Sequence, residues 1–190
     1  KPQAGQMKKI TAAIKEFTSA KNLAPKFAPP RYYLGVMYVW TMEYEKARDA
    51  LKSACDINPS FHQAMVKLAE AYWRLKKVDK ALAECERAIG IAPKYGPAYT
   101  IRGVCRLKSG DAKGALADFE QAKKLGEEGL GELTEMAKHE VEGPGWKQTF
   151  TCETANYIVT TPVSQELADD IGKHAEVIRK TYTKIFPEIV

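Results

Sequence analysis

The sequence predicts a mostly α-helical chain, in which a repetitive helical solenoid is followed by a small α+β segment of two short strands and a long helix. The first observation is a 34-residue period over about two-thirds of the 190-residue chain. The second is the helical spacing of apolar residues within each period. The third is a change to β-branched and aromatic residues near the C-terminus.

Each 34-residue unit has positions for a small residue, for a large residue and for a proline that ends the helix. In one unit the small, large and small residues Ala47, Leu51 and Ala54 fall on one helical face, because 3.6 residues make a turn. Pro59 cannot continue that helix and therefore ends it. The rows at 34-residue steps are Ala13, Ala47, Ala81 and Ala115; Phe17, Leu51, Cys85 and Phe119; Ala20, Ala54, Ala88 and Ala122; and Pro25, Pro59 and Pro93.

A second amphipathic run with a small central residue precedes each alanine pair. Its recurring triplets are Leu34, Gly35 and Tyr38; Leu68, Ala69 and Tyr72; and Arg102, Gly103 and Arg106. A helix pair of this length with these positions resembles the tetratricopeptide repeat (TPR). The resemblance implies a right-handed helix-turn-helix solenoid, with whole repeats at residues 28–61, 62–95 and 96–127. Residues 1–27 would be the second helix of a truncated repeat.

The array departs from the TPR pattern at both ends. Arg102 and Arg106 replace an apolar and an aromatic residue, and Glu127 replaces the closing proline. We expect these departures in a terminal repeat whose outer face meets solvent or a different domain. At the other end the sequence begins within a repeat, which indicates a fragment or a processed product, so the compartment is left open. The apolar face of residues 4–23 predicts a homo-oligomer formed through this orphan helix.

Charge divides the chain at the end of the array. Residues 1–126 carry 23 Lys or Arg against 12 Asp or Glu, whereas residues 127–190 carry 6 against 12. The basic residues are spread over both helices of each repeat, so no nucleic-acid partner is expected. No apolar run is long enough for a membrane span, which favours a soluble protein. Four cysteines form no C-x-x-C pair, and neither a metal nor any other cofactor is predicted.

In a TPR solenoid the first helices of the repeats line the concave groove. The resemblance therefore implies a partner-binding groove made of Tyr32, Tyr33, Val36, Val39, Trp40, Val66, Lys67, Glu70, Trp73, Arg74, Thr100, Ile101, Val104, Leu107 and Lys108. TPR grooves that hold acidic chaperone tails use a Lys/Asn clamp, whereas this sequence has Val36 and Glu70 where clamp asparagines are expected. We therefore expect a protein or peptide partner that is held by apolar anchors and has acidic flanks.

The sequence after the array has a different pattern. Residues 128–145 break the period and predict an acidic capping helix, centred on 130–141, before a Gly-Pro-Gly linker. Residues 146–190 predict a β-hairpin from 147–153 and 157–161, then an amphipathic helix capped at Thr161 or Ser164. The run Phe150-Thr151-Cys152-Glu153-Thr154-Ala155-Asn156-Tyr157-Ile158-Val159, with Ser164, Ala168, Tyr182 and Phe186, resembles the start of a bacterial zinc-metallopeptidase-like domain.

Catalysis is not expected of the chain as given. His139 and Glu140 lack the second histidine, one helical turn on, that a zinc peptidase needs. Phosphate-loop, nucleophile-elbow and dinucleotide motifs are missing from the sequence. The function predicted is a protein-interaction scaffold. The alternatives are a non-catalytic front region that positions substrate for a metallopeptidase, and a self-assembly module in which one copy fills another's groove.

Overall fold

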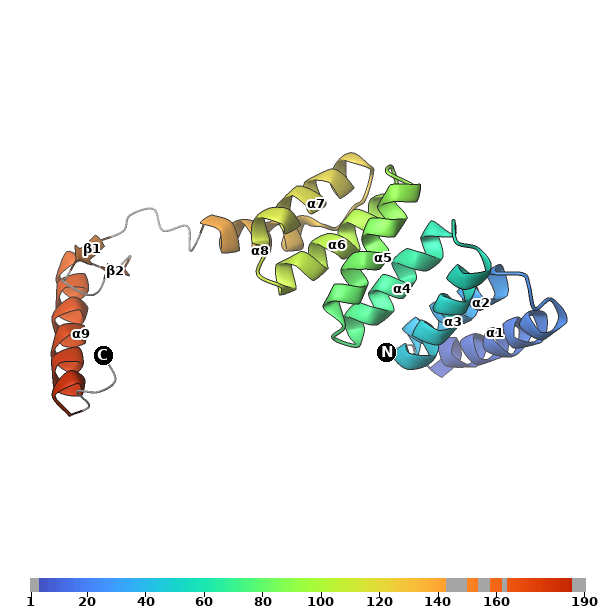
Figure 1. Cartoon of the computed structure of the whole chain (residues 1–190), viewed down its shortest axis with the longest axis horizontal. Coiled ribbons are helices and arrows are strands. Elements are labelled where there is room, and N and C mark those ends of the chain that lie inside the picture. The colour runs from blue at the N-terminus through green and yellow to red at the C-terminus, as the bar shows by residue number, and fades with distance from the viewer. Residues whose placement is uncertain (1–3, 143–149, 154–157, 162–163, 186–190) are drawn as a thin grey trace. The chain divides into compact units, whose positions relative to one another are not determined.

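The structure, a computed structural model, describes residues 4–142, 150–153, 158–161 and 164–185. The chain divides into two compact units, Lys1–Gly143 and Pro144–Val190. In the first unit each helix packs against the next one along the chain (Figure 1). Its helices are α1 (Ala4–Leu23), α2 (Pro29–Trp40), α3 (Tyr44–Ile57), α4 (His62–Arg74), α5 (Val78–Ile91), α6 (Gly96–Lys108), α7 (Ala112–Lys124) and α8 (Gly131–Glu142).

The small and large positions of the repeat form the core of this unit. In the pairs α2–α3, α4–α5 and α6–α7, each second helix turns its alanine rows and the residue between them inward. All nine side chains are fully buried: Ala47, Leu51, Ala54, Ala81, Cys85, Ala88, Ala115, Phe119 and Ala122. Burial of a large side chain such as Leu51 or Phe119 contributes about 1.5–3 kcal/mol. The helical solenoid predicted from the 34-residue period is therefore confirmed.

Close approach within a helix pair requires the small residue of the first helix. A Cβ atom on Gly103 of α6 would lie 2.6 Å from Cε1 of Phe119 on α7, and one on Gly35 would overlap Leu51. In these two pairs the large side chain of the second helix thus occupies the space that a missing Cβ leaves on the first. The α4–α5 pair has Ala69 and Cys85 at the same positions. This contact sets the distance between the two helices of a pair.

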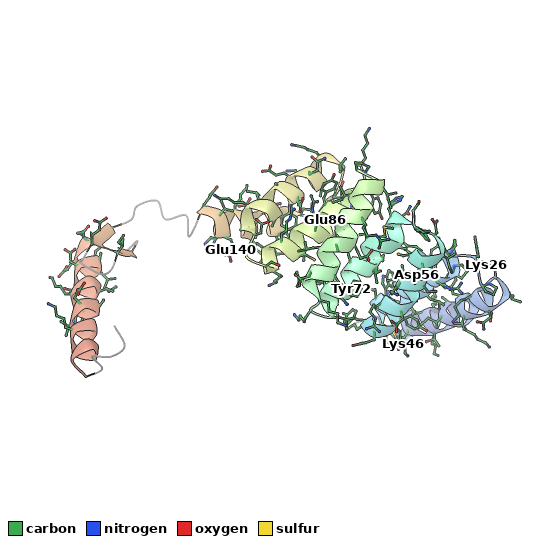
Figure 2. The ribbon with its side chains drawn as sticks, viewed as in Figure 1. Lys26, Lys46, Asp56, Tyr72, Glu86 and Glu140 are labelled. Atoms are coloured by element: carbon green, nitrogen blue, oxygen red, sulfur yellow. The ribbon has the colours of Figure 1, made fainter. Side chains whose placement is uncertain are left out.

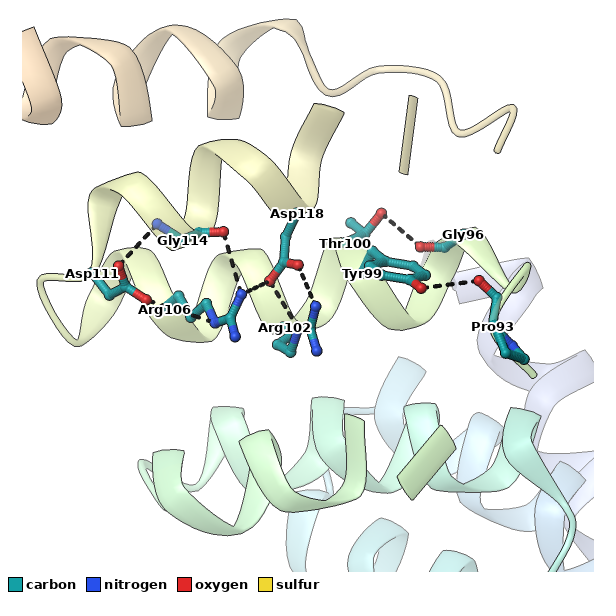
Figure 3. A network of polar contacts seen from close by, with 9 residues as sticks. All are labelled: Pro93, Gly96, Tyr99, Thr100, Arg102, Arg106, Asp111, Gly114 and Asp118. Carbon is teal, nitrogen blue, oxygen red and sulfur yellow. Dashed lines mark hydrogen bonds and ion pairs between the residues drawn. The ribbon is translucent and has the colours of Figure 1, made fainter. Parts of the chain in front are cut away.

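Helix α6 adds a polar connection to α7, centred on the carboxylate of Asp118, which is 3% exposed (Figure 3). Arg102 donates from Nε to Oδ2 at 2.9 Å and from Nη2 to Oδ1 at 2.6 Å. Arg106 donates from Nη1 to Oδ2 at 2.9 Å. The hydrogen bonds to Asp118 raise the pKa of Arg102, because they favour its charged form. The expectation that both arginines mark an outward face is wrong, because their guanidinium groups turn into the α6–α7 interface.

Helix α8 corrects the expectation that the period breaks after residue 127. Ala137 follows Gly35, Ala69 and Gly103 at the same 34-residue step and is fully buried. It forms a small core cluster with Ala115 and Phe119 of α7. Helix α8 is therefore related to α2, α4 and α6 by the repeat, although its sequence is acidic.

The second unit contains the strands β1 (Phe150–Glu153) and β2 (Ile158–Thr161) and the helix α9 (Gln165–Ile185). The strands are antiparallel, with Phe150 opposite Thr161 and Glu153 opposite Ile158, and α9 packs against both. The Ser164 Oγ accepts a hydrogen bond from the Leu167 amide at 3.1 Å, so Ser164 is an N-cap as predicted. Residues 154–157, which include the expected turn, lie outside the described residues.

The predicted fold class must be corrected for this unit. The described chain is almost entirely helical, and the 21 residues of α9 outweigh two paired strands of four residues each. A single hairpin of that size cannot supply a sheet with a core of its own, so the prediction of an α+β fold in the tail was wrong. The chain is a helical solenoid with a small appended unit. Within the described residues, no helix is both long and apolar enough to cross a membrane.

Replacing Asp118 with alanine should strongly destabilise the first unit. The change leaves Arg102 and Arg106 without their shared carboxylate in a mostly buried interface, which typically costs about 3–5 kcal/mol. Urea unfolding followed by circular dichroism measures this loss. The matched control is Asp49→Ala, which removes a surface ion pair with Arg48 and should cost less than about 1 kcal/mol. An Asp118→Ala chain as stable as this control would contradict the role given to the network.

Candidate functional site

Three helices carry all of the predicted groove residues. Helix α4 contacts both α2 and α6, so these first helices of the repeats lie side by side. Each contributes five residues at equivalent repeat positions, which we call the wall residues of α2, α4 and α6. Their degree of exposure differs widely along the wall. Exposure therefore decides which of them a partner could touch.

Three of the four exposed wall residues follow one row of the repeat. Trp40, Arg74 and Lys108 recur at the repeat interval, each near the end of its helix, and all three side chains are exposed. Trp40 is 58% exposed, an unusual value for a tryptophan. Tyr33, which is 46% exposed, lies on the same helix as Trp40. The wall thus presents aromatic surface on α2 and positive charge on α4 and α6.

Aromatic rings fix the geometry of the α2 part of the wall. Tyr33 stacks on Phe17 of α1 with a centroid distance of 5.1 Å and an angle of 15°. Tyr32 meets Tyr33 edge-on and also contacts Phe61, again with centroids 5.1 Å apart. Four rings therefore form a continuous line from α1 to the start of α4. Such offset and edge contacts hold the tyrosines in place without help from a partner.

The middle of the wall is nearly neutral. Lys67 Nζ lies 2.8 Å from Glu70 Oε2 on the same helix, and the Glu70 side chain is only 17% exposed. The Arg74 guanidinium lies over the Trp73 ring, 4.4 Å from its centroid. Arg74 therefore keeps its charge accessible while its planar group rests on an aromatic surface. The positive charge open to a partner is mainly that of Arg74 and Lys108.

The remaining wall residues are buried or half-buried, so they offer a partner little surface. Val66 is 3% exposed and belongs to the main core, so it presents no surface to a partner. Tyr32, Val39, Trp73 and Ile101 are half-buried against that core, and Val104 and Leu107 pack against the smaller cluster that contains Phe119. Val36 and Thr100 are half-buried as well. Thr100 Oγ1 donates to the Gly96 carbonyl at 3.5 Å.

Sequence reasoning missed the residues of α8 that continue the wall. Thr134, Glu135 and Lys138 follow Thr100, Ile101 and Val104 by one 34-residue step. They help to line a cavity of about 590 Å³ between α7 and α8, in which Lys138 pairs with Glu135 at 2.9 Å. The signal that could have found them is the buried alanine at position 137, in phase with the small residues of the other first helices. The acidic composition of 127–142 concealed it.

Three cysteines lie within the helical core and are unsuited to reaction. Cys55, Cys85 and Cys105 are all buried and free. Burial raises the pKa of the Cys55 thiol to about 12 and that of Cys105 to about 11, and it also raises the pKa of Cys85. The cause is desolvation of the thiolate. Among the described residues no cluster of His, Cys, Asp and Glu is placed to hold a metal ion.

These thiols should resist modification in the folded chain. In a Cys152→Ser background at pH 8, we expect Cys55, Cys85 and Cys105 to react with Ellman's reagent at least about 100-fold more slowly than in urea, because a pKa near 11 leaves only about one thiol in a thousand ionised. Absorbance of the released thiolate gives both rates. Equal rates in the folded and unfolded chains would show that the cysteines are accessible.

Comparisons with known proteins agree with the repeat. Residues 41–96 match the tetratricopeptide repeat family model. The chain is 32% identical over 142 residues to the DnaJ homolog subfamily C member 7 homolog of Dictyostelium discoideum, covering 66% of this chain and 26% of the relative. It is 32% identical over 91 residues to RNA polymerase II-associated protein 3 of Xenopus tropicalis, covering 48% of this chain and 14% of that protein. The chain thus spans about a quarter or less of these relatives.

Solved structures show the same fold. The first TPR of Spaghetti (RPAP3), bound to the HSP90 peptide SRMEEVD, has a TM-score of 0.58 at 24% identity, covering 61% of this chain and 94% of that one. A crystal structure of MamA has a TM-score of 0.56 at 28% identity, covering 61% and 68%. The helical array of this chain is therefore a TPR solenoid. The metallopeptidase resemblance of residues 146–190 stays a prediction.

Proposed function

We propose that this TPR solenoid binds a segment of a partner protein on the wall formed by α2, α4 and α6. The observation that carries the proposal is the exposed row of Trp40, Arg74 and Lys108. An apolar or aromatic residue of the partner packs against Trp40 and Tyr33. Acidic residues further along the partner pair with Arg74 and Lys108. The chain acts as a scaffold, and its binding energy comes from an apolar anchor with charged neighbours.

The relatives support a peptide as the partner. The first TPR of Spaghetti (RPAP3) is bound to SRMEEVD, a peptide with one methionine, one valine and three acidic residues. A segment of that kind offers both the apolar and the acidic groups that the exposed row would recognise. The array of this chain has the same fold as that domain, which makes the peptide a suitable first probe.

The wall differs from an asparagine-based clamp at its centre. Val36 offers no hydrogen bond, and Glu70 would repel a carboxylate while it neutralises Lys67 at 2.8 Å. Acidic groups are therefore accepted beside Arg74 and Lys108, beyond Glu70. This arrangement favours partners whose acidic residues follow an apolar anchor and lie beside Arg74 and Lys108. It disfavours partners with an acidic residue opposite the middle of α4.

Replacing Trp40 with alanine should weaken binding of fluorescently labelled SRMEEVD by at least about tenfold. The reason is that an exposed tryptophan in a binding surface commonly acts as a hot spot worth about 2 kcal/mol or more. Fluorescence anisotropy measures the affinity. Leu23→Ala is the matched control, because Leu23 is a large apolar residue that is 87% exposed and lies outside the wall. It should leave affinity unchanged.

A second peptide separates the two parts of the proposal. SRMEEVD with its three acidic residues changed to amides should bind more weakly to the wild-type chain and lose its dependence on Arg74. If the wild-type chain bound neither peptide, or if Trp40→Ala bound both as well as wild type, the wall would not be the binding surface.

Replacing Glu70 with glutamine should strengthen binding of the acidic peptide several-fold. The change removes a carboxylate that is largely shielded from solvent and releases Lys67 to contact the partner. The gain should shrink as salt is raised, since the Debye length falls from about 10 Å at 0.1 M to about 3 Å at 1 M. Titrations of both chains at low and high salt test this. An unchanged or weaker affinity at low salt would argue against a neutralising role for Glu70.

A further inference from the structure

Three basic side chains line a cavity of about 430 Å³ between α1, α2 and α3. Lys21 belongs to α1, Arg31 to α2 and Lys46 to α3. Lys46 lies at the edge of the first unit (Figure 2). Among the described residues that line the cavity, Asp49 alone is acidic, so the lining carries three positive charges against one negative charge. A cavity with this balance attracts an anion.

Two of the basic residues occupy positions that are apolar in the next repeat. One repeat further on, Cys55 of α3 stands at the position of Lys21, and Met65 of α4 stands at that of Arg31. Cys55 and Met65 are 4% and 0% exposed and belong to the main apolar core. At the junction of α1 and α2 the same two positions bring two like charges to one cavity, which is unfavourable without an anion.

Two small residues of α3, Ala50 and Ser53, line the same cavity. One repeat further on, their positions in α5 are occupied by Glu84 and Arg87, which form an ion pair at 2.8 Å. Helix α5 thus supplies a carboxylate together with its cation, whereas α3 has neither at these positions. The small side chains leave space in the cavity, and they add no negative charge to balance Lys21 and Arg31.

The acidic groups of α3 and of the turn before it are already paired. Asp49 Oδ1 lies 2.7 Å from Nη2 of Arg48, and the Asp49 side chain is 66% exposed. Glu43 accepts a hydrogen bond from Lys46 Nζ. These two carboxylates therefore do little to neutralise the cations that α1 and α2 contribute.

Lys21 and Arg31 keep their charge available to a ligand. Among the described residues neither of them forms an ion pair, although Arg31 Nη1 donates to the Phe27 carbonyl at 3.2 Å. Both side chains are half-buried, so their attraction for an anion is screened less by water than that of a fully exposed cation. Tyr38 and Ser53 also line the cavity, and their hydroxyl groups can donate hydrogen bonds.

We propose that this cavity binds the phosphate group of a phosphate monoester. A monoester carries a charge of about −1.5 to −2 at pH 7, which matches the net charge of the lining. The Arg31 guanidinium offers paired planar donors to the phosphate oxygens, and Lys21 offers a point charge. The volume lies in the range of small-ligand sites, so the organic part of the ester also has space. None of the wall residues lines this cavity, so the site is separate from the proposed peptide-binding surface.

A phosphorylated side chain of a partner protein and a small free phosphate ester share this chemistry. Calorimetric titration of the full chain at constant ionic strength compares them, with four probes: inorganic phosphate, O-phosphoserine, a phosphoserine peptide with glycine flanks, and its unphosphorylated form. The phosphorylated probes should bind and the unphosphorylated peptide should not. Tighter binding of the phosphopeptide than of O-phosphoserine identifies a side chain as the source, and the reverse identifies a small ester. If no phosphorylated probe binds, the proposal is overturned.

Two variants restore the apolar residues of the later repeats. Arg31→Met introduces the residue found at Met65, and Lys21→Ile introduces the residue found at Ile89 of α5. Each should weaken binding of the phosphopeptide by at least about tenfold, because each removes a charged hydrogen-bond donor. Lys8→Ile is the matched control, since Lys8 is an exposed lysine of α1 outside the cavity. It should bind like wild type. An equal loss in Lys8→Ile would indicate unspecific attraction and would overturn the proposal.

A third variant supplies the missing carboxylate from the chain itself. Ala50→Glu introduces the residue found at Glu84 of α5, placed to pair with Lys21 and Arg31. It should abolish binding of the phosphopeptide and keep the melting temperature at or above that of wild type, as measured by circular dichroism. A folded Ala50→Glu chain that bound the phosphopeptide as well as wild type would show that the phosphate does not enter this cavity.

Discussion

The rest of this structure depends on one packing constraint, the contact between a residue of minimal size on one helix and a large side chain on the next. Gly35 faces Leu51, and Gly103 faces Phe119, at distances that leave no room for a Cβ atom. This contact brings two helices close enough for the alanine rows around it to be fully buried. The middle pair, α4 and α5, has Ala69 and Cys85 at the same two positions, and both are fully buried. The first helices then lie side by side and form the wall.

The sequence predicted the helix pairs correctly because only a small residue fits at the contact between two paired helices. The alanine rows at 13, 47, 81 and 115 predicted helix pairs because a small residue was needed in every unit. Prediction failed at interface positions where either an apolar or a paired charged side chain can fit. Arg102 and Arg106 looked unsuited to an interface because their buried partner, Asp118, lies 16 and 12 residues away in sequence. Spacing alone does not reveal such a pairing.

The wall residues show a similar limit. The repeat phase put fifteen residues on the first helices, but phase does not specify exposure, which depends on what the neighbouring repeat contributes. Val66 is buried and Trp40 is open, although both were named by the same reasoning. In the tail, β-branched composition indicated two short strands, but it could not indicate that so small a hairpin would leave the described chain almost entirely helical. Helix α8 was not recognised as an equivalent of α2, α4 and α6, because its sequence is acidic and only Ala137 keeps the phase of the repeat.

The ionic network between α6 and α7 lies at a division in the core. One apolar cluster runs from α2 to α6, and a separate, smaller one joins α7 and α8 through Ala115, Phe119 and Ala137. Linear repeat arrays open by steps, and the first step falls where the fewest apolar contacts cross. The α6–α7 pair is held together both by the close contact of Gly103 with Phe119 and by the Arg102–Asp118–Arg106 network, which bridges the division between the two clusters. These two helices should therefore open and close together, as one block, when the end of the array unfolds.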